Sequence, residues 1–271
     1  MNSTVLFQIY NNLDRILNMR FRNFLYIVRQ FGFDPVKTIN SFFYFLKYLV
    51  SLIKFRQSLR GKKLRYVPSL NDYSDKAGTA DGHYFWQDFI CSRWIFKAST
   101  TEHLDVGSRI DGFISSVLVF CKVTLIDIRP LDIKIEGLSY INADIQCGIP
   151  HYAGAFDSVS SLHCIEHFGL GRYNDPLSLN GHETGLINIS KLVSNDGNLY
   201  VSFPIGEEVI EFNSQRIIDP LWPEKVLKNF RLEEFVLIPW KGVPKFGLNP
   251  RDVDKKVWGQ AGLYKFRRVD S

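Results

Sequence analysis

Beyond Ser99 the sequence alternates between short apolar runs and stretches of helical periodicity, and this alternation limits the folds open to the chain. Such an order predicts an α/β domain with a doubly wound, mostly parallel seven-stranded sheet. In a sheet of that kind the ligand binds outside the carboxyl ends of the strands. The expected strands are 102–108, 122–130, 138–145, 156–164, 198–206, 233–240 and 262–269, and the expected helices between them are 111–121, 182–194 and 223–230.

The N-terminal quarter differs from the rest in charge. Through Tyr66, twelve Lys and Arg residues stand against two Asp residues, which gives +10, whereas the whole chain has 33 basic and 28 acidic residues and a net charge of +5. The remainder is therefore −5, and any basic partner surface belongs to this quarter. We expect helices at 5–31 and 36–58, then a polar connection and a helix at 83–99. The predicted organisation is a basic, aromatic-rich helical extension (1–60), a connection with a helix that lines the ligand site (61–99), and the main domain (100–271).

The segment "TINSFFYFLKYLVSLIKF" (38–55) is the closest approach to a membrane span. Lys47 and Lys54 interrupt and close it, so it is expected either to pack on the main domain or to lie in a membrane interface. The basic residues alternate with large aliphatic ones and accompany no known motif, so no nucleic-acid partner is expected. Four cysteines without a C-x-x-C pair, and a first segment unlike a signal peptide, favour a reducing, cytoplasmic location, with peripheral contact at the inner membrane surface left open.

The turn after the first expected strand, "LDVGSRIDG" (104–112), distinguishes between two nucleotide ligands. Asp127 follows Asp105 by 22 residues, a spacing at which a carboxylate accepts hydrogen bonds from a ribose diol. A dinucleotide site needs a second glycine where this chain has Arg109, and the carboxylates of Asp105 and Asp111 disfavour a pyrophosphate. S-adenosylmethionine lacks phosphate and carries a sulfonium and an ammonium, so the electrostatics favour it over NAD.

The stretches "HLDVGSRIDGF", "VTLIDIRPL", "INADI" and "FDSVSSLHCIEHFGLGRYNDP", in this order, resemble the class I S-adenosylmethionine-dependent methyltransferases, which have a Rossmann-like fold. With "AGTADGHYFWQD" and "FPIGEEVIEFNSQR", the likeness extends over roughly residues 61–219. It is nearest to a bacterial family of unknown function that is often found near surface-polysaccharide genes. The resemblance implies methyl transfer to an oxygen of a carbohydrate-type or other small acceptor in polysaccharide biosynthesis.

The same resemblance assigns roles to individual residues. Asp105 and Gly107, with Ser108 and Arg109, would form the wall of the methionine pocket. The ribose hydroxyls and the adenine would meet Asp127, Ile128, Asp144 and Ile145, although Asp144 is also suited to cap a helix. The family's glycine motif is E/D-x-G-x-G-x-G; this chain matches it at Asp105 and Gly107 and replaces the later glycines with Arg109 and Asp111.

His163, Glu166 and His167 spell H-x-x-E-H, which in a helix is a zinc-protease signature. Here the motif straddles the end of the fourth expected strand, so we predict no metal ion. A hydroxyl acceptor needs a base, and histidine has a suitable pKa. His167 or His163 is the candidate, with Glu166 orienting an imidazole or contacting the donor; the alternative is that the histidines only cap backbone groups.

Further residues are candidates on weaker grounds. His83 and Gln87, one helical turn apart, would line the donor pocket. Acceptor-side candidates are Arg172, Tyr173, His182, Glu211, Asn213 and Arg216. Two other functions stay open: a non-catalytic scaffold of the same fold, and an NAD-dependent sugar oxidoreductase, although the Tyr-x-x-x-Lys pair expected of the latter is not suitably placed. The oligomeric state is not indicated.

Overall fold

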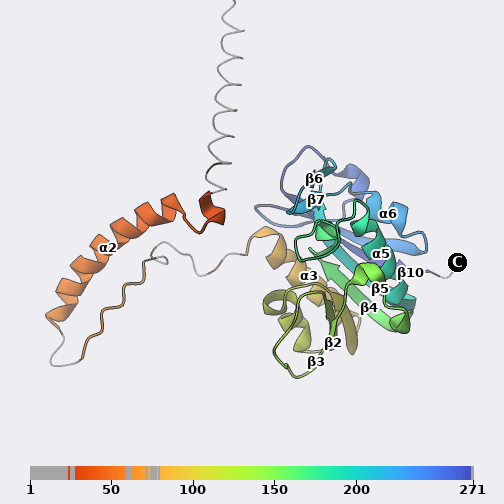
Figure 1. Cartoon of the computed structure of the whole chain (residues 1–271), viewed down its shortest axis with the longest axis horizontal. Coiled ribbons are helices and arrows are strands. Elements are labelled where there is room, and N and C mark those ends of the chain that lie inside the picture. The colour runs from red at the N-terminus through yellow and green to blue at the C-terminus, as the bar shows by residue number, and fades with distance from the viewer. Residues whose placement is uncertain are drawn as a thin grey trace, which may run out of the picture. The chain divides into compact units, whose positions relative to one another are not determined.

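The computed structural model describes residues 24, 28–58, 63–70, 73, 78 and 80–269. The chain forms two compact units, Met1–Thr79 and Ala80–Ser271 (Figure 1). Most of the helix expected at 5–31 lies outside the described residues. Within them, no helix is both long enough and apolar enough to cross a membrane.

In the first unit, the helix expected at 36–58 is present as α2 (Pro35–Arg56). Proline suits the first helical turn because its missing N–H would be unpaired there. Asp34 caps the helix, since its carboxylate accepts hydrogen bonds from the backbone N–H groups of Val36 and Lys37.

The second unit is built on one large sheet, with strand order β3-β2-β1-β4-β5-β10-β8-β9 (Figure 1). The first five of these pair in parallel, and β10 is antiparallel to both of its neighbours. The predicted doubly wound, mostly parallel sheet is thereby confirmed, with a short eighth strand, β9, at one edge. The strands are β1 (Glu102–Val106), β2 (Lys122–Asp127), β3 (Leu138–Asn142), β4 (Phe156–Leu162), β5 (Val193–Ile205), β8 (Phe230–Pro239), β9 (Lys245–Phe246) and β10 (Gln260–Arg268).

Helices cover both faces of this sheet, so its two faces bury separate apolar cores. Along β5, Leu199 and Val201 belong to the core beneath α5, whereas Tyr200 between them belongs to the core beneath α3. This division follows from the strand geometry, in which successive side chains point to opposite faces. The helices and helical turns are α3 (Gly82–Lys97), η1 (Ile110–Ile114), α4 (Ser115–Leu118), η2 (Ile145–Cys147), η3 (Pro150–Tyr152), η4 (Ile165–His167), α5 (Gly181–Leu192), α6 (Trp222–Val226) and η5 (Pro250–Asp252).

Several elements differ from the sequence expectation in their bounds, and two of them differ most. The Asn195-Asp196-Gly197 segment, expected as a turn after α5, lies inside β5, which begins at Val193; Asp196 absorbs the irregularity with φ of 58°. The helix expected at 223–230 ends at Val226. A separate hairpin, β6 (Val209–Glu211) and β7 (Gln215–Ile217), follows β5.

The turns after β1 and β4 lie against each other at the carboxyl edge of the sheet. Gly107 follows β1 with φ of +77°, and a Cβ at this position would lie 2.1 Å from Sγ of Cys164. Only glycine combines this conformation with so close an approach. After β4, His163 also has a positive φ, of 48°. A left-handed histidine is uncommon, and it places the H-x-x-E-H segment at the sheet edge rather than in a continuing helix.

Candidate functional site

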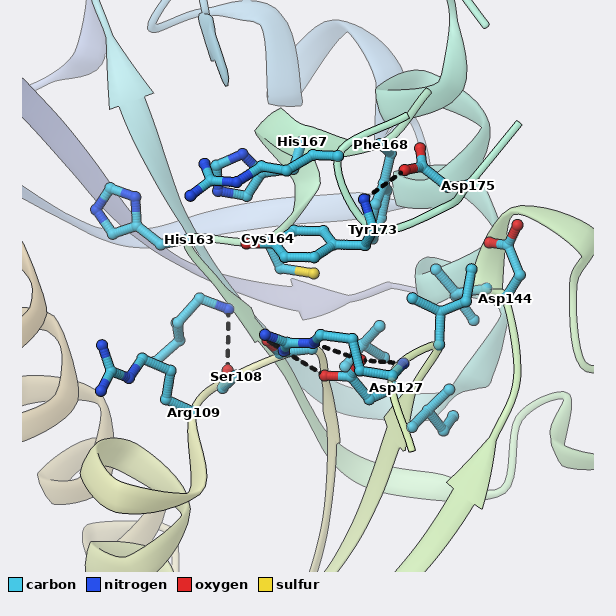
Figure 2. Close-up of a pocket in the computed structure, with 18 of the residues that line it drawn as sticks. Ser108, Arg109, Asp127, Asp144, His163, Cys164, His167, Phe168, Tyr173 and Asp175 are labelled. Carbon is cyan, nitrogen blue, oxygen red and sulfur yellow. Dashed lines mark hydrogen bonds and ion pairs between the residues drawn. The ribbon is translucent and has the colours of Figure 1, made fainter. Parts of the chain in front are cut away.

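A cavity of about 270 Å³ opens at the carboxyl ends of β1 to β4, where a doubly wound sheet binds its ligand. Figure 2 shows Asp127, Ser108 and Arg109 on one side of it, and His163, Cys164, His167 and Tyr173 on the other. Of the residues expected at the site, the following line the cavity: Gln87, Gly107, Ser108, Arg109, Asp127, Ile128, Asp144, Ile145, His163, His167, Arg172 and Tyr173.

Asp127, at the end of β2, faces the cavity already paired with Arg129. The guanidinium donates Nε–H to Oδ1 at 2.9 Å and an Nη2 hydrogen to Oδ2 at 2.5 Å. Arg129 also lies over the ring of Tyr173, 4.9 Å from its centroid, and so joins the two sides of the cavity. A carboxylate has about four lone-pair positions. The guanidinium occupies two of them and the backbone N–H of Arg129, which donates to Oδ1 at 2.8 Å, occupies a third, so Asp127 can accept one further hydrogen bond.

Asp144 has two tasks that the sequence analysis treated as alternatives. Its carboxylate caps η2 by accepting from the backbone N–H of Gln146 at 2.9 Å, and it also lines the cavity. Ile128 and Ile145 contribute apolar surface on the same side. The ends of β2 and β3 therefore combine acceptor oxygens with apolar contact, the combination that suits a nucleoside.

Asp105 does not line the cavity but lies fully buried beneath the turn that does. Its carboxylate accepts from the backbone N–H of Ser108 at 2.9 Å, from Oγ of Ser108 at 2.7 Å and from Oγ of Ser160 at 2.5 Å. Burial raises the pKa of Asp105 to about 6, although these hydrogen bonds oppose the shift. Asp105 thus positions the turn after β1, and its carboxylate does not reach the cavity.

Arg109 and Asp111, the two departures from the glycine motif, pair with each other. Nε of Arg109 donates to Asp111 at 2.9 Å and Nη2 donates at 2.6 Å. Both side chains are more than 60% exposed, at 64% and 69%. Arg109 borders the cavity and Asp111 does not. Their opposite charges therefore neutralise each other at the opening of the cavity.

Glu166 joins the two candidate bases. It is fully buried, and His163 Nδ1–H donates to its Oε1 at 2.7 Å, while His167 Nε2 lies 3.8 Å from the same oxygen. Burial alone would raise the pKa of Glu166, but the charges and hydrogen bond of the two histidines outweigh it and hold that pKa below its ordinary value. Glu166 is therefore an ionised acceptor that fixes the tautomer of His163.

The two histidines differ in what their second nitrogen meets. His167 Nδ1–H donates to the backbone carbonyl of Ser214 at 2.6 Å. His163 Nε2 and Glu166 Oε2 are buried and have no hydrogen-bond partner among the residues that the structure describes. A buried polar atom without a partner is costly, by about 1–3 kcal/mol, and its usual explanation is a water, an ion or a ligand that completes it.

The helix α3 lines the cavity with residues that the sequence analysis did not select. Tyr84 and Asp88 reach it, together with the expected Gln87. Burial raises the pKa of Asp88 to about 7. His83 is not in the cavity wall but stacks on His163 at 5.3 Å between ring centroids, and burial, aided by the charge of His163, lowers the pKa of His83 to about 4.

Four of the acceptor-side candidates lie away from the cavity wall. Arg216 is buried, and its guanidinium donates to four backbone carbonyls, those of Glu166, Phe168, Ser178 and Leu179. His182 stacks on Trp222, and burial, with the charge of Arg216 adding to it, lowers its pKa to about 4. Glu211 and Asn213 are exposed on the β6–β7 hairpin. Arg216 thus holds the H-x-x-E-H segment and its loop in place, whereas Arg172 and Tyr173 do border the cavity.

The H-x-x-E-H motif has no helical geometry here. β4 ends at Leu162, and η4, a single 3₁₀ turn, covers Ile165–His167. The expectation that the motif straddles the end of the fourth strand is confirmed. Among the described residues, no group of three His, Cys, Asp or Glu side chains could hold a metal ion.

The strand order identifies the fold. A parallel sheet in the order 3-2-1-4-5 is the doubly wound, Rossmann-like order, and here an antiparallel strand, β10, lies between β5 and β8. The model of the family described as "Caenorhabditis protein of unknown function, DUF268" matches residues 122–232, less than half of the chain. That description names no activity, and it does not carry the bacterial polysaccharide association that the sequence resemblance implied.

Solved structures of this fold are similar to the chain at low sequence identity. The 1,6-didemethyltoxoflavin-N1-methyltransferase of Burkholderia thailandensis, solved with S-adenosylhomocysteine, is 14% identical, with a TM-score of 0.49 over 68% of this chain and 79% of that one. The N-methyltransferase NodS of Bradyrhizobium japonicum WM9 is also 14% identical, with a TM-score of 0.47 over 68% and 86%. The [4+2]-cyclase SpnF is 12% identical, with a TM-score of 0.49 over 68% and 82%. No curated protein matches the sequence significantly. The fold assignment therefore rests on the strand order itself.

Proposed function

We propose that the protein is an S-adenosylmethionine-dependent methyltransferase that acts on a hydroxyl of a carbohydrate-type or other small acceptor. One observation carries the proposal. One side of the cavity carries Asp127 and Asp144 with their apolar neighbours, which suit a nucleoside. On the opposite side lies His163, which is hydrogen-bonded to the buried carboxylate of Glu166.

The residues on the strand-end side fit the donor. Asp127 has one acceptor position left for a ribose hydroxyl, and Asp144 can accept from the adenine amino group, with Ile128 and Ile145 against the ring. No glycine-rich turn offers the backbone approach that a pyrophosphate needs, since Arg109 stands in that place. The largely exposed pairing of Arg109 with Asp111 at the cavity opening supports the view that these two residues leave the donor site open.

When bound, S-adenosylmethionine supplies an activated methyl group for in-line displacement. The chain's own part is to position the acceptor, exclude water and take up its proton. His163 is our preferred base: Nδ1–H donates to Glu166, so Nε2 is the basic nitrogen, and the carboxylate stabilises the imidazolium that forms. His167 holds its ring through Ser214 and lies on the other side of Glu166, which favours a positioning role.

The unpartnered atoms favour a hydroxyl-bearing acceptor. Both His163 Nε2 and Glu166 Oε2 accept hydrogen bonds, so the group that completes them must donate. Alcohols and sugars donate through each hydroxyl. A role in polysaccharide biosynthesis is consistent with this chemistry and follows from the sequence resemblance alone.

The test is a transfer assay with S-adenosylmethionine labelled in its methyl group, against nucleotide sugars and short glycan fragments. We expect label in an alkali-stable ether product, lost when His163 is replaced by Ala and retained when His182 is replaced by Ala. His182 is a matched control because it is a partly buried histidine outside the cavity wall. Transfer that is equally fast in the His163→Ala variant would refute the assigned base.

Two rival functions make different predictions in the same preparation. A non-catalytic scaffold of this fold would transfer no methyl group to any acceptor, since a fold alone does not define an activity. An NAD-dependent sugar oxidoreductase would bind the nicotinamide cofactor and change its absorbance as the cofactor is reduced or oxidised. Donor binding in the presence and absence of NAD separates all three.

A further inference from the structure

The helix α2 carries a continuous apolar stripe on one side. Its members recur at spacings of three and four residues, which places them on one face of a helix. Each of them is between 36% and 63% exposed, and no residue of α2 is buried. The stripe consists of Ile39, Phe42, Phe43, Leu46, Leu49, Val50 and Ile53.

All charged side chains of α2 are cationic. Lys37, Lys47, Lys54 and Arg56 are its only ionisable residues apart from tyrosines, and no acidic residue lies in its first turn. On a helical projection Lys47 and Lys54 border one edge of the stripe and Arg56 the other, whereas Lys37 projects to the opposite side. Lysines in this position extend their apolar stems along such a surface while the ammonium group reaches outward.

The described contacts of α2 with the segment that follows it lie on the other side. Tyr44 stacks on Tyr73 with 5.1 Å between ring centroids, and Nζ of Lys47 lies 4.9 Å from the same ring. Tyr44, Tyr48 and Leu52, which share this side, are half-buried. The neighbouring segment therefore covers the polar side and leaves the stripe uncovered within the described part of this unit.

We propose that α2 is a membrane-surface helix, with the stripe inserted at the headgroup boundary of an anionic bilayer and with Lys54 and Arg56 at the headgroups. The helix has 22 residues, and it is not apolar enough to span a bilayer. An apolar stripe bordered only by cations fits a surface that is both apolar and anionic. A second copy of α2 fits less well, because it would bring a further set of cations with no acidic residue to pair with them.

The test uses the full-length protein in vesicle flotation, with vesicles of phosphatidylcholine alone and of phosphatidylcholine with about 30% phosphatidylglycerol. We expect partitioning onto the anionic vesicles that is at least about tenfold stronger and that weakens as salt is raised. A Phe42→Ser, Leu46→Ser double variant removes stripe area, and a Lys54→Glu, Arg56→Glu double variant reverses the charges beside the stripe; each should weaken binding by at least about tenfold.

Controls come from the second unit. Val119→Ser removes an apolar side chain that is 84% exposed, and Lys134→Glu reverses an exposed charge; both should bind vesicles as the wild type does. Unchanged S-adenosylmethionine titrations of the stripe variant would show that the second unit is intact. The proposal is overturned if the wild type does not float with anionic vesicles, if the controls lose binding equally, or if the stripe variant changes sedimentation from dimer to monomer while vesicle binding persists.

Discussion

The two sides of the cavity differ in how far their polar groups are paired within the chain. On the strand-end side, charges are matched within the chain: Asp127 with Arg129, and Arg109 with Asp111. On the histidine side, polar atoms of His163 and Glu166 are buried without partners among the described residues. We infer that the side with the paired charges holds a ligand. The side with the buried, unpartnered atoms of His163 and Glu166 reacts with it.

This contrast has a physical basis. A paired, partly exposed charge contributes little to stability and changes partner readily, so a ligand can share it at small cost. A buried unpaired group costs folding energy and persists only where something else compensates for it, which is typical of functional sites. Substitutions of His163 and Glu166 are therefore expected to lower kcat strongly. Substitutions of Asp127 and Arg109 are expected to change the affinity for the donor to different degrees.

The largest effect is expected from Glu166→Gln. The substitution keeps the shape of the side chain but removes the charge that stabilises an imidazolium on His163, so kcat should fall by about 10²–10⁴-fold. The dissociation constant of S-adenosylmethionine, measured by calorimetry, should change by less than about threefold. An equal loss in donor affinity would mean that Glu166 contacts the donor, and the division between the two sides would fail.

Gly107→Ala tests where the two sides meet. The added Cβ would lie 2.1 Å from Sγ of Cys164 at a φ of +77°, so we expect a loss of about 2–4 kcal/mol in unfolding free energy, measured in urea. Cys164→Ala in the same chain removes the sulfur and should recover part of that loss, leaving the backbone strain. Full additivity of the two substitutions would contradict the contact.

Asp88, which lines the cavity from α3, has a raised pKa because burial outweighs the hydrogen bond that it accepts from Gln87. Its folded-state pKa of about 7 lies above the ordinary 3.8, so the protonated form is favoured by folding. The stability that this proton contributes is complete below about pH 4 and is lost as the pH rises through 7. Asp88→Asn should therefore raise the thermal midpoint at pH 8 and leave it nearly unchanged at pH 4. The exposed carboxyl of Asp132 provides the control, and a gain at both pH values would rule out the titration.

The smallest effect is expected from Arg109→Ala. Because the pair with Asp111 is largely exposed, its removal should change unfolding free energy by less than about 1 kcal/mol and donor affinity by less than about threefold. Thermal melts and calorimetry would measure both. A loss of donor affinity beyond about tenfold would place the guanidinium on the ligand and not at the mouth.

Seven strands of the large sheet were predictable because each contains a short apolar run with its own flanking turn, whereas the short strands β6, β7 and β9 were not predicted. The strand-end residues Asp127 and Asp144 were predictable for the same reason, since parallel strands bring their carboxyl ends together. Arg129 was missed, although it follows Asp127 by two residues in "DIRP"; a cation so close to a candidate acceptor is a usable signal.

The burial of individual charged side chains was not predictable from the sequence pattern. Asp105 and Arg216 looked like ligand contacts because charged side chains are seldom buried, yet Ser160 satisfies the first and four backbone carbonyls satisfy the second. Periodicity also showed which face of α3 is apolar without showing that Tyr84 and Asp88 reach the β1 turn. These contacts depend on tertiary neighbours far away in the sequence.

The most direct measurement is isothermal titration of the full-length protein with S-adenosylmethionine, with NAD as the competing ligand. Asp127→Ala removes the expected ribose contact, and Asp111→Ala removes an exposed carboxylate outside the cavity wall. The account predicts saturable binding of S-adenosylmethionine, no binding of NAD, a loss of affinity of about ten- to a hundredfold in Asp127→Ala, and wild-type affinity in Asp111→Ala. Folded protein that binds no S-adenosylmethionine, or that binds NAD instead, would contradict it.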